Sequence, residues 1–271
     1  MPIFGFTNIP GSVITQTSIA VASGGASDAD AQAFITAASI TDPTQISAID
    51  QLVIDLKGYN IWTKMKAIYP ICGGSASSHA VNLISPGTYD LTFSTGWTHA
   101  STGMTPASAY ANTNLATTGN VTQNSASMGF YNRTNTATVG AHGLRNSLSS
   151  PTALFEIFER YTDNNFYCYL NDSGVFSGVN SDSRGFFQGS RTASNAIRLN
   201  RNTSTFTGTS VSNGTSTLNV YIGASNFNNT ATYYQNREIS FFYIGSGLTN
   251  SEMQNYYTRV QAFNTALNRQ V

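Results

Sequence analysis

The feature that most constrains the fold is a series of nine short segments with the alternating or aromatic apolar pattern of β-strands. Clusters of Gly, Asn, Ser and Asp separate them, for example 171–174 and 212–214, and such clusters favour turns. Because no helical pattern lies between them, they predict a mainly β chain whose antiparallel strands form a two-sheet jelly-roll sandwich. The predicted strands are residues 65–71, 80–84, 89–95, 127–132, 153–160, 165–171, 196–200, 217–222 and 238–244.

One pair of these segments predicts a hairpin that turns at Asp163 and Asn164. Its facing apolar positions are Phe155, Ile157, Phe166, Cys168 and Leu170. Two long polar stretches, 98–121 and 180–195, exceed the length of normal hairpin loops. We expect these two stretches to be loops that cover one face or rim of the sandwich.

The C-terminal end of the chain predicts a helix over residues 249–267. Thr249 and Glu252 have the spacing of a capping box, in which each side chain accepts a bond from the other residue's backbone. Behind them, apolar side chains recur at helical spacing, so one stripe of the helix docks on an apolar surface. A preceding strand and this docked helix together close a folded module.

The N-terminal part predicts two shorter helices. Residues 27–40 carry a start signal and a short apolar face. A second helix begins at Asp42 and Pro43 and ends just before Gly58. Two short helices make a weak core alone, so we expect them to pack on the following sheet or on another chain.

The sequence therefore predicts three parts. Residues 1–24 form an extended arm, with one strand near 15–21, that lies on a neighbouring subunit. Residues 25–64 form a helical collar or anchor, and residues 65–271 form the jelly roll closed by the terminal helix. Because a small helical collar commonly completes its core with copies of itself, we expect a symmetric homo-oligomer.

Composition narrows the function classes. Charged residues make up 10% of the chain, against roughly a quarter in an average protein, and the 13 acidic and 13 basic residues cancel. This balance argues against a nucleic-acid-binding protein and against a polybasic membrane binder. The 40% of apolar residues are spread along the chain, which argues against disorder.

The sequence also lacks targeting signals. Its N-terminus has no signal-peptide pattern, and no stretch approaches the ~20 apolar residues of a membrane span. We therefore expect a soluble protein that is made in the cytoplasm but carries a surface of exported type. Virus particles, which assemble inside cells and then work outside them, combine these two properties.

The order of the elements resembles the concanavalin A-like jelly roll of the laminin-G or pentraxin type. A further resemblance is carried by residues 50–57 and 61–70, the loop with 96–97, 103–106 and 109–113, and the ending with 256–257, 260–263 and 267–270. These stretches resemble structural proteins of tailed bacteriophages, in which a helical collar precedes a lectin-like sandwich in tail, baseplate or capsid-surface subunits.

This resemblance implies a structural subunit of a phage virion, such as a tail, baseplate or decoration protein, and not an enzyme. It implies copies of the chain itself, other virion proteins and a host surface glycan as partners, and the virion as location. Two alternatives stay open: a carbohydrate-binding module or receptor-binding lectin, and a glycan hydrolase.

A glycan hydrolase needs two carboxylates on either side of the scissile bond. The laminarinase-like families place them on one strand in a Glu-x-Asp-x-x-Glu pattern, and the nearest match here is 155–160. Glu156 and Glu159 are three residues apart, so on a regular strand they face opposite sides and cannot share a substrate. We expect two surface acids, with Arg160 available to pair with one of them, and no catalytic residue.

Histidine and cysteine give few chemical signals. His79, His99 and His142 each lack a second His or acid at metal-ligand spacing, so we expect solvated loop side chains. A Ser-His-Asp triad stays open because its members need not be adjacent, although no Gly-x-Ser-x-Gly turn occurs. Cys72 and Cys168 either pair across the sandwich or are two buried thiols, and we favour the thiols.

Calcium is the cofactor that the sequence leaves open, because lectin-like sandwiches often hold Ca²⁺ with loop carboxylates. The candidate ligands are Asp163 and Asp172, with the cluster 180–182 as a weaker third. Each of these clusters is also an ordinary Asx turn, which is the interpretation that we favour. No metal site is therefore predicted.

Sugar binding needs only aromatic faces and a few amides or hydroxyls. Several aromatic residues lie in or beside loops rich in Asn and Thr, although Tyr is also favoured in cores and at subunit contacts. The candidates for glycan contact are Trp97, Tyr110, Tyr131, Tyr167, Tyr233 and Tyr234.

Overall fold

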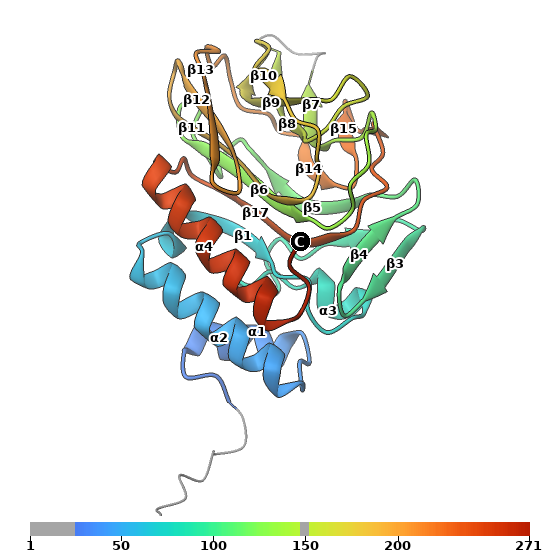
Figure 1. The fold of residues 1–271 in the computed structure, drawn as a ribbon, viewed down its shortest axis with the longest axis vertical. Helices are drawn as coiled ribbons and strands as arrows, with labels where there is room; N and C mark the ends of the chain where they lie inside the picture. The colour runs from blue at the N-terminus through green and yellow to red at the C-terminus, as the bar shows by residue number, and fades with distance from the viewer. Residues whose placement is uncertain (1–24, 147–151) are drawn as a thin grey trace, which may run out of the picture.

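The structure, a computed structural model, describes residues 25–146 and 152–271. These residues form seventeen strands in two sheets that pack face to face, together with a few helices (Figure 1). The predicted mainly β sandwich with a C-terminal helix is therefore confirmed. The predicted arm over 1–24 lies outside the described residues.

Sheet A has eight strands in the order β13-β12-β11-β6-β17-β4-β3, with β1 also paired to β17. Strand β17 lies at its centre, next to β6 on one side and next to β1 and β4 on the other. The strands of sheet A are β1 (Met65–Tyr69), β3 (Trp97–Ala100), β4 (Gly103–Pro106), β6 (Ala126–Asn132), β11 (Gly185–Ala193), β12 (Ala196–Arg201), β13 (Ser204–Gly208) and β17 (Ile239–Gly245).

Sheet B has nine strands in the order β10-β9-β8-β7-β14-β5-β2, with the hairpin β15–β16 attached to β7. Strand β15 runs parallel to β7, whereas the other pairs of this sheet in the described residues are antiparallel. Its strands are β2 (Thr92–Phe93), β5 (Ala111–Ala116), β7 (His142–Asn146), β8 (Ala153–Phe158), β9 (Asn165–Asp172), β10 (Ser177–Val179), β14 (Asn219–Ile222), β15 (Ser225–Phe227) and β16 (Thr230–Thr232).

The inner faces of the two sheets enclose one apolar core. The hairpin β8–β9 supplies part of it in the predicted register, with Phe155 opposite Leu170 and Ile157 opposite Cys168. Asn164 has the positive φ of 60° that a tight turn requires, and Asn tolerates this conformation better than most residues. The hairpin and its inward positions are therefore confirmed.

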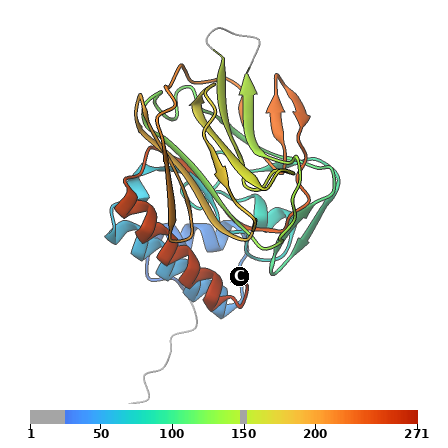
Figure 2. The ribbon, with the colours of Figure 1, turned by 45° about the horizontal axis from the view of Figure 1, so that its top comes forward.

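A layer of helices covers the outer face of sheet A (Figures 1 and 2). A second apolar core lies beneath it, built from fully buried aromatic side chains such as Phe186, Phe241, Tyr243 and Tyr256. The helices are α1 (Ala29–Ala37), α2 (Pro43–Gly58), the short α3 (Ala76–Ala80), α4 (Asn250–Ala266) and a 3₁₀ turn, η1 (Trp62–Lys64). None of the helices in the described residues is long and apolar enough to span a bilayer.

The predicted helix signals act as expected. The Thr249 hydroxyl accepts from the backbone N–H of Glu252 at 3.3 Å, and the Glu252 carboxylate accepts from the backbone N–H of Thr249 at 2.8 Å. Asp42 caps α2 by accepting from the backbone N–H of Gln45 at 2.9 Å. Helix α2 ends at Gly58, one residue later than predicted.

The helices of residues 25–64 share a core with the sandwich. Phe34 of α1 and Leu52 of α2 belong to the same buried cluster as Phe241 of sheet A. The core that two short helices lack is thus supplied by the sheet and by α4, so the structure gives no reason to seek it in another copy. The anchoring role of these helices and self-association stay predictions.

Three segment predictions are wrong. Residues 180–195 contain strand β11, which pairs with β6 and β12, and residues 98–121 contain most of β3 and all of β4 and β5. Residues 80–84 form no strand, because the Asn82 side chain accepts from the backbone N–H groups of Ile68 and Ile84 and replaces ladder bonds there. Polar residues misled the prediction in the first two segments, where bonds from distant elements allow their burial.

Candidate functional site

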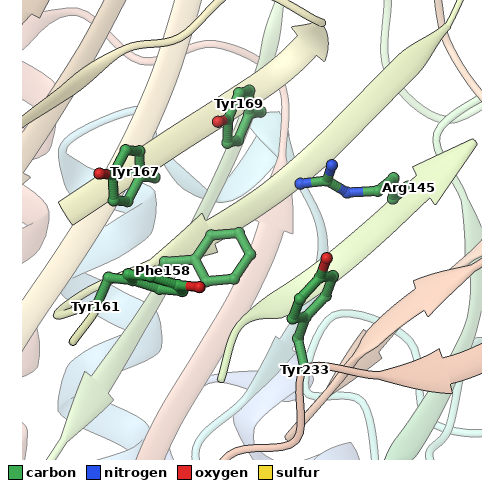
Figure 3. A pocket seen from close by; sticks show the side chains of 6 residues that line it. All are labelled: Arg145, Phe158, Tyr161, Tyr167, Tyr169 and Tyr233. Atoms are coloured by element: carbon green, nitrogen blue, oxygen red, sulfur yellow. The ribbon is translucent and has the colours of Figure 1, made fainter. Parts of the chain in front are cut away.

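A pocket opens on the outer face of sheet B, the face turned away from the core (Figure 3). Its volume is about 170 Å³. Strands β7, β8 and β9, the turn after β8 and the segment after β16 together build it. The residues that line it are Arg145, Phe158, Tyr161, Tyr167, Tyr169 and Tyr233.

The alternation of the strands places these side chains on one face. In the β8–β9 ladder, Glu156 lies opposite Tyr169 and Phe158 lies opposite Tyr167. Directly opposite residues of paired strands project to the same side, while the positions between them fill the core. The inward residues Phe166 and Cys168 thus fix Tyr167 and Tyr169 on the outer face.

Arg145 is held in place by a buried carboxylate. The Arg145 Nε donates to Glu156 Oε1 at 2.9 Å and Nη2 donates to the same oxygen, while Ser225 Oγ donates to Oε2 at 2.6 Å. Glu156 is completely buried, and burial raises its pKa, while Arg145 and Ser225 oppose that rise. Gly143 allows this packing, because a Cβ there would lie 2.1 Å from the Phe155 carbonyl oxygen.

Two tyrosines flank the guanidinium of Arg145. Its Cζ lies 5.9 Å from the ring centroid of Tyr169 and 5.7 Å from that of Tyr233, which is the range of cation–π contacts. Phe158 packs edge-on against Tyr233 at 5.5 Å and against Tyr161 at 5.8 Å. The pocket therefore presents pre-positioned aromatic walls and one fixed cation with N–H donors.

A second aromatic group lies on the same outer face. Tyr110 and Tyr221 stack with their ring centroids 4.3 Å apart and their planes at 14°. Tyr234, which follows Tyr233 of the pocket, is 37% exposed. Burial raises the pKa of Tyr221, and its neighbours Tyr110 and Tyr234 add to that rise.

The structure separates the predicted glycan contacts into groups. Tyr167 and Tyr233 line the pocket, and Tyr110 and Tyr234 belong to the second aromatic group. Trp97 is half-buried: its ring packs against Phe93 and the core cluster. Contact with sugar at these positions stays a prediction.

Tyr131 is a wrong candidate. It is fully buried beneath the helices, and its hydroxyl donates to Gln261 at 2.9 Å and accepts from the backbone N–H of Val271 at 2.9 Å. The sequence shows Tyr131 in an aromatic strand but does not show that α4 covers that face. Conversely, we missed Arg145 and Tyr169, although the alternation of Tyr169 with the inward Cys168 was a usable signal.

The two glutamates face opposite sides, as predicted, but they are not surface acids. Glu156 points to the outer face, whereas Glu159 points between the sheets, where it accepts from Arg237 Nη1 at 2.7 Å and from Gln235 Nε2 at 3.0 Å. Both are fully buried, and neither has Arg160 as an ion-pair partner in the described residues. Two arginines distant in sequence supply the charge compensation that buried carboxylates need.

The predicted solvation is also wrong for two of the histidines, His142 and His79. His142 is buried in the core, where burial, aided by Arg237, lowers its pKa to about 3. His79 is buried, and its Nδ1 lies 2.9 Å from Nδ1 of His99, so one of the two nitrogens carries a proton. Burial above all lowers the pKa of His79 to about 3. The described residues contain no group of three His, Cys, Asp or Glu arranged for a metal.

The remaining candidates have structural partners. Asp172 does not sit in an open turn, because its carboxylate is fully buried and paired with Arg191. Asp163 accepts from the backbone N–H of Asn165 at 2.9 Å, which is the bond of an Asx turn. Cys72 and Cys168 are free buried thiols in different core clusters, which confirms the prediction that we favoured. The alternative, a disulfide between them, is wrong.

Comparisons with known proteins support the fold. The sequence matches no protein-family model and no curated protein. A mutant of Trypanosoma rangeli sialidase displaying trans-sialidase activity gives a TM-score of 0.52 at 8% identity, over 79% of this chain and 39% of that chain. The binding domain of botulinum neurotoxin serotype D gives 0.50 at 11% identity, over 73% of this chain and 52% of that one.

The chain thus spans about two fifths and about half of those two chains. At such low identity the likeness shows a shared β-sandwich fold alone. It supports the jelly-roll part of the predicted resemblance. Neither likeness concerns a bacteriophage, so the phage relationship stays a prediction.

Proposed function

We propose that this chain is a glycan-binding β-sandwich protein and that the pocket around Arg145 is its site. The observation that carries the proposal is the fixed guanidinium between Tyr169 and Tyr233, held from below by the buried Glu156. Aromatic faces pack against the C–H groups of a sugar ring, and the N–H groups of arginine donate hydrogen bonds to its oxygens. A site that is already ordered loses little conformational entropy on binding.

The size of the pocket suits one sugar ring. Its volume of about 170 Å³ is below the roughly 300–1,000 Å³ of pockets for drug-sized ligands. Arg145 and Glu156 cancel in charge, so binding does not depend on a large electrostatic attraction. The likeness in fold to a sialidase and to the binding domain of a toxin is in keeping with this role.

Catalysis is not part of the proposal. Glu156 has both oxygens occupied by Arg145 and Ser225, and Glu159 lies between the sheets with Arg237. Two carboxylates in these positions do not converge on one bond as glycoside hydrolysis requires. Release of reducing ends from a bound glycan, lost in Glu156→Gln, would contradict this.

A glycan array followed by titration calorimetry tests the proposal. We expect saturable binding of at least one glycan, and at least a tenfold loss of affinity in Tyr233→Ala, because aromatic residues at the centre of a site commonly carry most of the affinity. The matched control is Tyr59→Ala, a tyrosine of similar exposure that lies on the helix layer. An array without a bound glycan, or equal affinity of the two variants, would contradict the proposal.

We further infer that the domain is displayed on a phage particle, as a tail, baseplate or capsid-surface subunit. The scarcity of charged residues and the sequence resemblance support this inference, and the pocket would then face a host surface glycan. Electron microscopy of particles that contain the chain tests it. Density for the sandwich on the particle exterior is the expected result, and a monomer without affinity for itself or for other virion proteins would count against it.

A further inference from the structure

The pocket is one end of a longer row of side chains on the outer face of sheet B. The strand registers place Tyr169, Glu156, Gly143, Tyr221 and Asn112 directly opposite one another on β9, β8, β7, β14 and β5. Directly opposite residues share a face, so this row leads across the sheet from the pocket to the stacked pair Tyr110–Tyr221. Neighbouring strands are about 4.8 Å apart, so Tyr221 on β14 lies roughly 10 Å from β8 at the pocket floor.

The segment of Tyr233 and Tyr234 connects the two ends. Tyr233 lines the pocket, whereas Tyr234 acts electrostatically on Tyr221 and helps to raise its pKa. Backbone bonds hold the segment over the sheet: the N–H of Ala141 donates to the Tyr233 carbonyl at 2.9 Å, and the N–H of Gln235 donates to the Gly223 carbonyl at 2.7 Å. Two adjacent tyrosines are therefore fixed along the row.

Tyr233 also has strained backbone. Its φ is 50°, in the left-handed region that a bulky side chain rarely adopts. Such strain persists where the surroundings impose it, and it concentrates at functional sites. Here the strained residue is the one whose ring completes the pocket.

The polar groups along the row also suit a sugar chain. In the described residues, the only charged members of the row and pocket are Glu156 and Arg145, which neutralise each other. Beyond them come tyrosine hydroxyls and the amide of Asn112, which bond to neutral hydroxyl groups. Glu156, Gly143 and Tyr221 in the middle of the row are buried, so the row offers its accessible aromatic and polar groups at its two ends, with Tyr169 at the pocket and Tyr110 and Asn112 at the other end.

We propose that the site extends across β7 and β14 to Tyr110 and Tyr221, so that the preferred ligand is a chain of several sugar rings and not a single terminal sugar. The inference rests on the glycan-binding function proposed above. The pocket holds one ring, and a ligand must be longer to reach the stacked pair as well. The pocket and the stacked pair then act as separate subsites.

Titration calorimetry with oligosaccharides of one to six rings tests the extent of the site. The probes are four series: β-1,4-linked glucose, β-1,4-linked N-acetylglucosamine, α-1,5-linked arabinose and α-2,8-linked sialic acid. For a series that binds, we expect affinity to rise with length and to level off after a few rings. Tyr110→Ala is expected to weaken the longer members about fivefold to tenfold and to leave the shortest binding member unchanged.

Tyr233→Ala is expected to weaken every member of the series, because it removes the pocket wall itself. Tyr59→Ala again serves as the control without effect. Equal affinity from one ring to six, or equal binding of long oligomers by Tyr110→Ala and the wild type, would overturn the extended site while leaving the pocket proposal intact. Absence of binding in all four series would instead overturn the proposed function, and the extended site with it.

Discussion

The two outer faces of the sandwich carry similar aromatic residues, but helices bury those of one face, whereas those of the other face surround an open pocket. On sheet A, Phe186, Phe241 and Tyr243 are fully buried beneath α1, α2 and α4. On sheet B, Tyr169 and Tyr233 surround an open pocket with Arg145. In the described residues no helix layer covers that pocket, and a buried carboxylate holds its one cation in place.

The difference shows that aromatic alternation alone does not reveal the use of a sheet face. An apolar face needs a cover, and the helix layer supplies one for sheet A. The face that stays open carries tyrosines and the partly exposed Arg145, whose polar ends tolerate water, while the partner carboxylate Glu156 is buried beneath them. The covered face should therefore determine stability, and the open face should determine binding.

The largest expected effect is on the covered face. Phe241→Ala removes a fully buried ring that contacts Tyr256 and Phe263 of α4 edge-on. Such truncations cost about 3–5 kcal/mol, because they lose apolar burial and leave a cavity. Urea denaturation followed by circular dichroism measures the change. A loss below about 1 kcal/mol would mean that the helix layer is not a main source of stability.

A fall in pH should lower the stability of the fold through His142, which is buried in the core. The folded pKa of His142, about 3, lies below its ordinary value near 6.5, so the unfolded chain takes up a proton that the folded chain excludes. Stability should therefore fall as the pH drops from about 6.5 towards 3, by up to about 1.4 kcal/mol per pH unit for this group. Denaturation at several pH values should show a smaller slope in His142→Gln. An unchanged slope would contradict the burial of a neutral imidazole.

A smaller effect is expected where α4 begins. Thr249→Ala removes the hydroxyl that caps the backbone N–H of Glu252, and loss of such a cap costs about 1 kcal/mol. Thr258→Ala, at an exposed position within the same helix, is the control and should change stability little. If both variants are equally stable, the capping box does not contribute to attachment of the helix layer.

The smallest change in stability is expected at the open face. Tyr233→Ala removes a side chain that is 38% exposed, and the unfolding free energy should change by about 0.5 kcal/mol or less. Parallel denaturation of this variant and Phe241→Ala compares the two faces directly. A loss at Tyr233 as large as that at Phe241 would assign the open-face aromatics to the core of the fold.

Local signals predicted the elements whose causes are local. The capping box at Thr249, the Asp42 cap and the inward alternation of Phe155 and Ile157 all depend on residues close in sequence. These signals were enough for the two-sheet sandwich and its C-terminal helix. They carry no information on which face a helix will cover, which is why Tyr131 was misassigned to the surface.

Strand β11 shows why some strands and the pocket could not be predicted from the sequence. Its polar residues suggested a loop, yet Gln188 Nε2 donates to the Met253 carbonyl at 2.8 Å and Ser190 Oγ donates to the Leu248 carbonyl at 2.7 Å. Partners far along the chain thus allow these side chains to be buried. The same holds for the pocket, because Arg145 and Tyr233 meet only after the strands pair and the later segment folds over them.

The most direct test of the open face as a binding face is a crystal structure of the chain with a bound oligosaccharide from the series above. We predict one sugar ring in the pocket, in contact with Tyr233 and Tyr169, with an oxygen within hydrogen-bond distance of the Arg145 guanidinium. A sugar bound on the helix layer or at a strand edge, with the Arg145 pocket empty, would contradict the account.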